Sequence, residues 1–187
     1  MRDQDKTQLA FIMDGLKQEF EHTLKARTER YLKVKPHGIV PNTEFAAASM
    51  ECTHLFRDGH FYGSVALSQA VAEAIAKFLC HKNGWKPRKS FEENVGRLHK
   101  RQFISPDLKD AFLRIWDKRD DYHHLNPAIE THRMKLEALA YEKVSLLKAI
   151  ESEVFEFSIV DGKLVPKNRK YWETHDDGTT PVYLRLE

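Results

Sequence analysis

Apolar residues recur at steps of three and four along most of the first 150 residues, which is the spacing of one helix face. Three long segments carry this pattern, at about residues 5–31, 60–83 and 126–150. Three shorter ones begin near residues 43, 90 and 105. The segment 60–83 has a wide apolar face, and its small residues let a neighbouring helix approach closely. We therefore expect this helix and the last one in contact at the centre of a bundle.

Local signals predict several helix ends. Ser90 followed by Glu93 fits a capping box, which opens a helix. Ser105-Pro106 combines an N-cap serine with a proline in the first turn. Asn126-Pro127 repeats this start signal for the last long helix, and Gly84 stands where a left-handed C-cap is expected.

From about residue 155 the apolar pattern changes to the alternation that is typical of strands. Phe155, Phe157 and Ile159 alternate and, with Leu164, flank Asp161-Gly162, a strong hairpin turn signal. Tyr171-Trp172 and residues 182–184 are expected to form further short strands. The predicted fold class is therefore mainly α: an antiparallel helical bundle over residues 1–153, with a small β-rich appendage over 154–187. The appendage is too small to fold alone, so we expect it packed on the bundle within a single domain.

Composition favours a soluble globular protein. Apolar residues make up 41% of the 187 and charged residues 31%. The longest apolar runs are far short of a membrane span, and the charged N-terminus lacks the apolar core of a signal peptide. Cys52 and Cys80 each lie in an apolar helical pattern, so we expect two reduced, buried thiols. These features predict a cytoplasmic protein with no membrane association.

Charge is unevenly distributed although the net charge is only +2. Between Lys82 and Arg119 the chain has eleven lysines and arginines and five acidic residues. Between Asp120 and Asp161 it has nine acidic residues and four basic ones. The basic segment either attracts a polyanion or forms a solvated face that nearby acids balance.

Residues 118–127 carry the main candidate chemistry, because a dense ionisable cluster falls at the junction between two apolar helices. Arg119 can hold a phosphate through two hydrogen bonds. His124 or His123 can act as general base or acid near neutral pH. An arginine with a histidine suits cleavage of RNA by its own 2′-hydroxyl, with no metal or other cofactor required.

The spacing of Arg119, four residues and then His124 resembles the Arg-x(4–6)-His motif of the HEPN superfamily of helical domains. Residues 60–79 also resemble that family's first core helix. The resemblance spans roughly residues 58–150 and leaves the first helix and the β-rich tail unexplained. Asp120 stands where the family usually has asparagine, which bears on activity rather than on the fold. His124 is the preferred motif histidine, and His123 also fits.

The resemblance implies a four- or five-helix bundle that forms a homodimer, with both motifs facing one cleft. It also implies a metal-independent endoribonuclease of the kind found in toxin–antitoxin, phage-defence or RNA-processing systems. Some members are instead non-catalytic binding or assembly modules. The expected partners are therefore RNA, a second copy of the chain and an antitoxin or regulatory protein.

Placement of the motif leads to a specific expectation for the site. Arg119 is predicted near the end of the fifth helix, and His124 just before the next helix, beside Asn126-Pro127. Both are expected to face one cleft, where Asp120 or Tyr122 orients them. The N-terminus of the next helix would favour a bound phosphate and lower the pKa of the histidine. Two further residues, Arg114 and Lys118, would extend a cationic surface along the nucleic-acid backbone.

Three alternatives stay open at the level of sequence. Arg119 can belong to a structural ion network with Asp117, Asp120 and Asp121, while His124 caps a helix. A divalent metal site is the second alternative, with the candidate ligands Asp120, Asp121, His123, His124 and His132. Bundle metal sites often use Glu-x-x-His pairs, and Glu19…His22 and Glu51…His54 have this form. Glu73 is a candidate bridging carboxylate for such a site, although Gln69 and Glu73 also suit a solvated face. The third alternative is a non-catalytic interaction protein.

Overall fold

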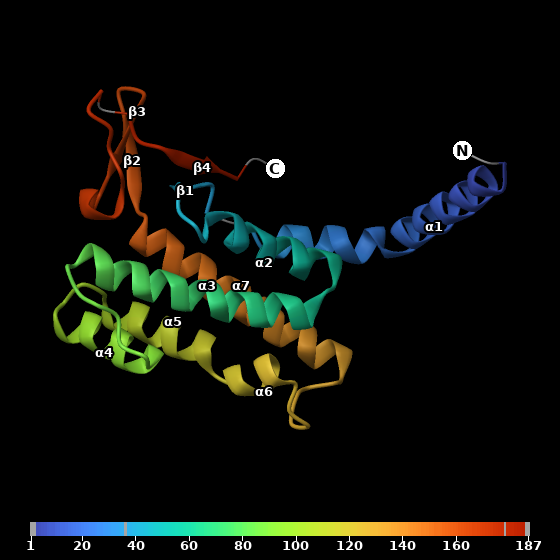
Figure 1. Ribbon diagram of the computed structural model, residues 1–187, viewed down its shortest axis with the longest axis horizontal. Coiled ribbons are helices and arrows are strands. Elements are labelled where there is room, and N and C mark those ends of the chain that lie inside the picture. Colours follow the sequence, from blue (N-terminus) through green and yellow to red (C-terminus); the bar gives the residue numbers. More distant parts are fainter. Residues whose placement is uncertain (1–2, 36, 178, 186–187) are drawn as a thin grey trace. The chain divides into compact units, whose positions relative to one another are not determined.

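The computed structural model of the protein describes residues 3–35, 37–177 and 179–185 and is mainly helical (Figure 1), which confirms the predicted fold class at this level. The chain divides into two compact units, Met1–Lys33 and Val34–Glu187. The sequence predicts a bundle over residues 1–153 with an appendage over 154–187 packed on it within one domain. The β-rich tail belongs to the same compact unit as helices α2 to α7.

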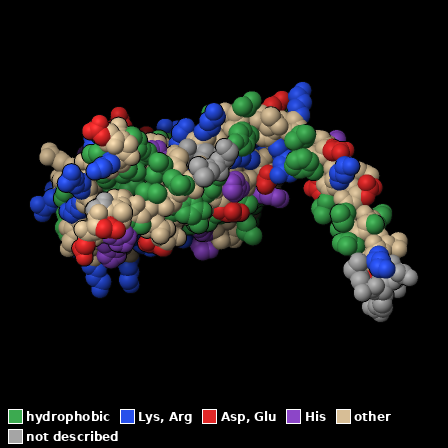
Figure 2. All heavy atoms as spheres, turned by 90° about the horizontal axis from the view of Figure 1, so that it is seen from above, with side chains coloured by type: hydrophobic (Ala, Val, Ile, Leu, Met, Phe, Trp, Pro, Cys, Tyr) green, Lys and Arg blue, Asp and Glu red, His purple; other side chains and the backbone are tan. Residues whose placement is uncertain are grey.

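The first unit is one helix, α1 (Asp3–Lys33). Its predicted apolar stripe is present, but the side chains of this stripe are exposed rather than buried. Figure 2 shows hydrophobic side chains on the surface of this helix, at the right of the view. They include Leu9, Ile12, Met13, Leu16, Phe20 and Leu24.

The second unit is built around α3 (Phe61–Lys82), which contacts α2 (Ala46–Asp58), α4 (Phe91–Lys100), α5 (Pro106–Trp116) and α7 (Arg133–Val154). The contact between α3 and α7 is the most extensive, as predicted. By length and composition α3 alone among the described helices is apolar enough to cross a membrane. Most of it is buried inside the bundle, so its hydropathy is that of a core helix.

Two of the three predicted helix starts are confirmed. The Ser90 hydroxyl accepts a hydrogen bond from the Glu93 backbone N–H, and the Ser105 hydroxyl accepts one from Leu108. The prediction at Asn126-Pro127 is wrong, because α7 begins only at Arg133. There the Asn-Pro pair forms a turn, closed by a hydrogen bond from the Ile129 N–H to the Asn126 carbonyl. The same residue types favour turns and helix starts, so the local signal does not separate them.

The hairpin around Asp161-Gly162 is confirmed: β2 (Phe157–Val160) pairs antiparallel with β3 (Lys163–Pro166). Residues 182–184 also form a strand, β4 (Val182–Leu184), which pairs with β1 (Ile39–Pro41) at the other end of the chain. Tyr171-Trp172 is not a strand. Arg169–Tyr171 forms a 3₁₀ helix, η1, and both aromatic rings are buried against the bundle. Their hydrophobicity reflects packing on Phe78 and Phe155 rather than strand pairing.

Both cysteines are buried and carry free thiols, as the sequence predicted. Burial raises the pKa of Cys52 to about 12. The reactive form of a cysteine is the thiolate, so Cys52 is chemically inert in the folded chain.

Candidate functional site

The candidate residues lie on a short helix, α6 (Arg119–His124), that the sequence analysis did not predict. Helix α5 ends at Trp116, and the chain then turns through Asp117 and Lys118. Lys118 adopts a left-handed backbone conformation with φ of 61°, which is unfavourable for a residue with a side chain. The turn therefore depends on contacts from other helices.

Two buried donors hold this turn. Gln69 of α3 donates a side-chain hydrogen bond of 3.0 Å to the Asp117 carbonyl. Lys143 of α7 donates to the same carbonyl over 3.1 Å and to the Arg114 carbonyl over 2.5 Å. These carbonyls end α5 and have no partner within that helix. Gln69 and Lys143 are therefore positioning residues for α6.

Sequence reasoning missed Lys143, although a signal was available. The residue lies among the buried apolar positions Ala140, Val144 and Leu147, where a lysine is rarely found without a partner. Burial lowers the pKa of the Lys143 ammonium. The sequence favoured a solvated face for Gln69 over support of the site from a neighbouring helix, but Gln69 is fully buried and donates to the turn before α6.

Lys143→Met should lower the free energy of unfolding by about 1–3 kcal/mol, because the Arg114 carbonyl loses its donor from Lys143 and the Asp117 carbonyl keeps only Gln69. The pKa of Lys143 is lower in the folded than in the unfolded chain, so the unfolded chain binds more protons between the two values. Wild type should therefore gain stability from Lys143 as pH rises through the folded pKa. Urea denaturation at pH 7 and pH 10 gives the free energy of unfolding of wild type and of Lys143→Met. The amount by which wild type is more stable should be larger at pH 10. The same difference in free energy of unfolding at both pH values would contradict the lowered pKa of Lys143.

Arg119 lies at the edge of a shallow surface hollow. The guanidinium stacks 5.2 Å from the Trp116 ring centroid, and its Nη1 donates to Asp120 Oδ1 over 3.0 Å. The side chain is about one-third exposed, and its Nε is buried without a hydrogen-bond partner among the described residues. The hollow measures about 300 Å³. We call it the Arg119 hollow; its described lining is Glu92, Trp116, Asp117, Lys118, Arg119, Asp120 and Asp121.

The two histidines lie beside this hollow, and neither belongs to its described lining. His123 follows Arg119 by one helical turn and is exposed. Burial lowers the pKa of His123, and the charge of Arg119 lowers it further; the Ala66 backbone and Glu73 of α3 raise it. His124 is also exposed and follows Asp120 by one turn. The predicted position of His124 beside the N-terminus of the next helix is wrong, because the loop 125–132 separates it from α7.

Tyr122 anchors α6 to the bundle. It is buried, its ring lies 6.2 Å from that of Tyr62, and burial raises the pKa of its phenol. Asn126 donates from its backbone to the Asp121 carbonyl over 3.0 Å. Tyr122 and Asp121 therefore fix α6 in place, while the exposed face of the helix carries Asp120 and His124.

The two predicted nucleic-acid contacts have different surroundings. Lys118 lines the Arg119 hollow. Arg114 instead pairs with Glu142 at 2.8 Å and with Asp110 at 3.8 Å, which raises its pKa. These acids offset the positive charge of Arg114. The cationic surface that was expected to include Arg114 therefore does not reach it.

The residues proposed for a metal site are not gathered together. Glu51 and His54 form an exposed pair at 3.9 Å. In the part of the chain that the structure describes, no three His, Cys, Asp or Glu side chains are grouped closely enough to hold a metal ion.

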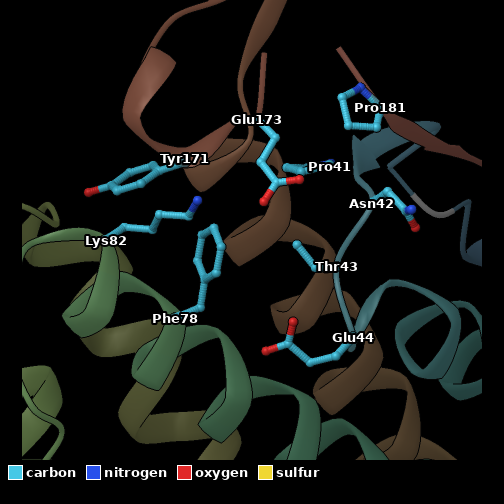
Figure 3. A pocket seen from close by; sticks show the side chains of 9 residues that line it. All are labelled: Pro41, Asn42, Thr43, Glu44, Phe78, Lys82, Tyr171, Glu173 and Pro181. Atoms are coloured by element: carbon cyan, nitrogen blue, oxygen red, sulfur yellow. The ribbon is translucent and has the colours of Figure 1, made fainter. Parts of the chain in front are cut away.

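A second hollow, of about 200 Å³, lies where the tail meets the bundle (Figure 3). Glu44, Lys82 and Glu173 direct their charged ends toward it from three different segments. Phe78 and Tyr171, whose rings lie 6.2 Å apart, line the same hollow. Its charges are mixed, so it has no evident preference for a ligand of one sign.

Comparison with family models, curated proteins and solved structures finds nothing similar to this chain. A function is therefore inferred from the geometry of α6 and from the family resemblance of its sequence.

Proposed function

We propose that this protein is a cytoplasmic, metal-independent endoribonuclease of the HEPN type, with its site on α6. The observation that carries the proposal is the pairing of functional groups on one exposed helix. Arg119 and His123 are one turn apart, and so are Asp120 and His124. Arg119 reaches an open hollow that is large enough for a phosphate group.

The chemistry assigned to these groups is RNA cleavage by internal transfer. The 2′-oxygen attacks phosphorus and the bond to the 5′-oxygen breaks, which leaves a 2′,3′-cyclic phosphate. One histidine accepts the proton of the 2′-hydroxyl, and the other returns a proton to the leaving 5′-oxygen. Arg119 stabilises the charge that develops on the phosphoryl oxygens.

The two histidines are given different roles. The lowered pKa of His123 keeps more of this side chain neutral near pH 7, as a proton acceptor requires. His124, at the spacing of the motif and exposed, is assigned the return of the proton to the leaving group. Asp120, which precedes His124 by one turn, can orient it.

A homodimer fits the openness of this site. The Arg119 hollow is shallow, and both histidines are exposed. Leu125 and Met134, on either side of the loop that follows α6, are 69% and 76% exposed, which is unusual for large apolar side chains. A second copy seated there would cover them and close the hollow.

The test is cleavage of labelled RNA in excess chelator. Wild type should cleave, His124→Ala and His123→Ala should lose about 100-fold or more in rate, and the control His81→Ala should keep full activity. His81 is an exposed histidine near the end of α3, so the control makes the same change away from α6. Cleavage that requires added metal would favour a metal enzyme. RNA or protein binding without cleavage would favour an interaction module.

A further inference from the structure

A second surface gathers cations and aromatic rings away from the Arg119 hollow. Trp85 lies in the connection between α3 and α4. The Arg97 guanidinium stacks 4.9 Å from its ring centroid, and Phe103 packs edge-on to it at 5.3 Å. Lys170, from the C-terminal tail, lies 5.5 Å over the Phe103 ring. Cations and rings thus alternate from the α3–α4 connection through α4 to Lys170 in the distant C-terminal tail.

This surface is also strongly basic. Between Lys82 and Pro106 the only acidic residues are Glu92 and Glu93, both in the first turn of α4. The segment between α3 and α4, together with one residue of α4, lines a trough of about 530 Å³, which we call the basic trough. Its lining residues are Gly84, Trp85, Lys86, Pro87, Arg88, Lys89 and Arg97. Lys100 and Arg101 lie exposed at the end of α4.

We propose that the basic trough binds single-stranded RNA. Proteins that bind single strands combine cations that follow the phosphates with rings on which bases stack. The basic trough has the cations and the Trp85 ring, and Phe103 packs against Trp85 beside it. A concave surface suits a strand better than a flat lipid bilayer, which would require protruding apolar side chains. RNA binding at the basic trough does not depend on the proposed nuclease function. The further step, that the bound strand is the substrate of the nuclease, rests on that function.

The trough lies close enough to the Arg119 hollow to deliver a strand to it. Glu92, in the first turn of α4, lines that hollow, whereas Arg97 belongs to the last turns of the same helix. Ten residues of helix span about 15 Å, the length of a few nucleotides. Phe91 stacks on Trp116 at 4.2 Å, which fixes α4 beside the Arg119 hollow.

The test measures binding of a fluorescent oligoadenylate of about 12 nucleotides to the full chain by anisotropy, over a range of salt. Three exposed lysines, Lys86, Lys89 and Lys100, are changed to glutamine together. The slope of log affinity against log salt should fall by about 2, because single strands lose about 0.7 per phosphate contact. The matched control changes Lys135, Lys148 and Lys163, equally exposed but on α7 and the hairpin, and should leave the slope unchanged.

Stacking is tested separately with Phe103→Ala, which removes the exposed ring beside the basic trough and should weaken binding by about tenfold. Equal binding by the trough variant and the control variant would overturn the proposal. The proposal would also be overturned if the trough variant lost binding to vesicles rich in phosphatidylserine but kept its binding to RNA. If wild type binds RNA through the trough but never cleaves it, the proposed nuclease function fails while this inference stands.

Discussion

Arg119→Ala should reduce RNA cleavage by about 100- to 1,000-fold, because removal of a group that stabilises developing charge has effects of this size. The melting temperature should change by no more than about 2 °C, since Arg119 stacks on the partly exposed Trp116 and pairs with the exposed Asp120. Single-turnover cleavage and thermal unfolding on the same samples check both expectations.

Two further variants separate the roles of charge and shape at this position. Arg119→Lys keeps the charge but loses the bidentate geometry, so it should recover only part of the activity. Lys118→Ala removes a neighbouring cation from the Arg119 hollow and should affect substrate binding more than the chemical step. If Arg119→Ala unfolds the protein instead, the cluster is a structural ion network and the nuclease proposal loses its main support.

Arg185→Met should lower the free energy of unfolding by about 3–5 kcal/mol, the largest stability effect that we expect. Arg185 donates to both oxygens of Glu151, over 2.6 and 2.9 Å, and both side chains are buried. It also donates to the carbonyls of His37 and Ala46. The substitution leaves the Glu151 carboxylate buried and unpaired, and it releases strand β4 from α7. Chemical denaturation measures the loss.

The double variant Arg185→Met with Glu151→Leu should recover much of the lost stability, because no buried charge is left without a partner. The exposed pair Lys167–Glu156, at 2.7 Å, is the matched control, and Lys167→Met should have little effect. Equal losses at the two pairs would show that burial of the Arg185–Glu151 pair is not what makes it important.

The amino-acid sequence by itself determined the elements whose signals are local. Helices α3, α4 and α5 follow from apolar periodicity and from the Ser90 and Ser105 caps, and the β2–β3 hairpin follows from its Asp-Gly turn. These signals act within a few residues, so they hold whatever the rest of the chain does. The same reasoning placed Arg119, Asp120 and the two histidines in one segment.

Tertiary structure alone decided how that segment is presented. Arg119–His124 forms a helix because Gln69 and Lys143, from two distant helices, hold the turn before it. The β1–β4 pairing and the joining of Lys170 to Phe103 likewise connect residues far apart in the chain. Local sequence reports the conformation that a segment prefers. It does not report which buried donor will meet a free carbonyl from across the core, and that contact sets the direction in which the candidate site faces.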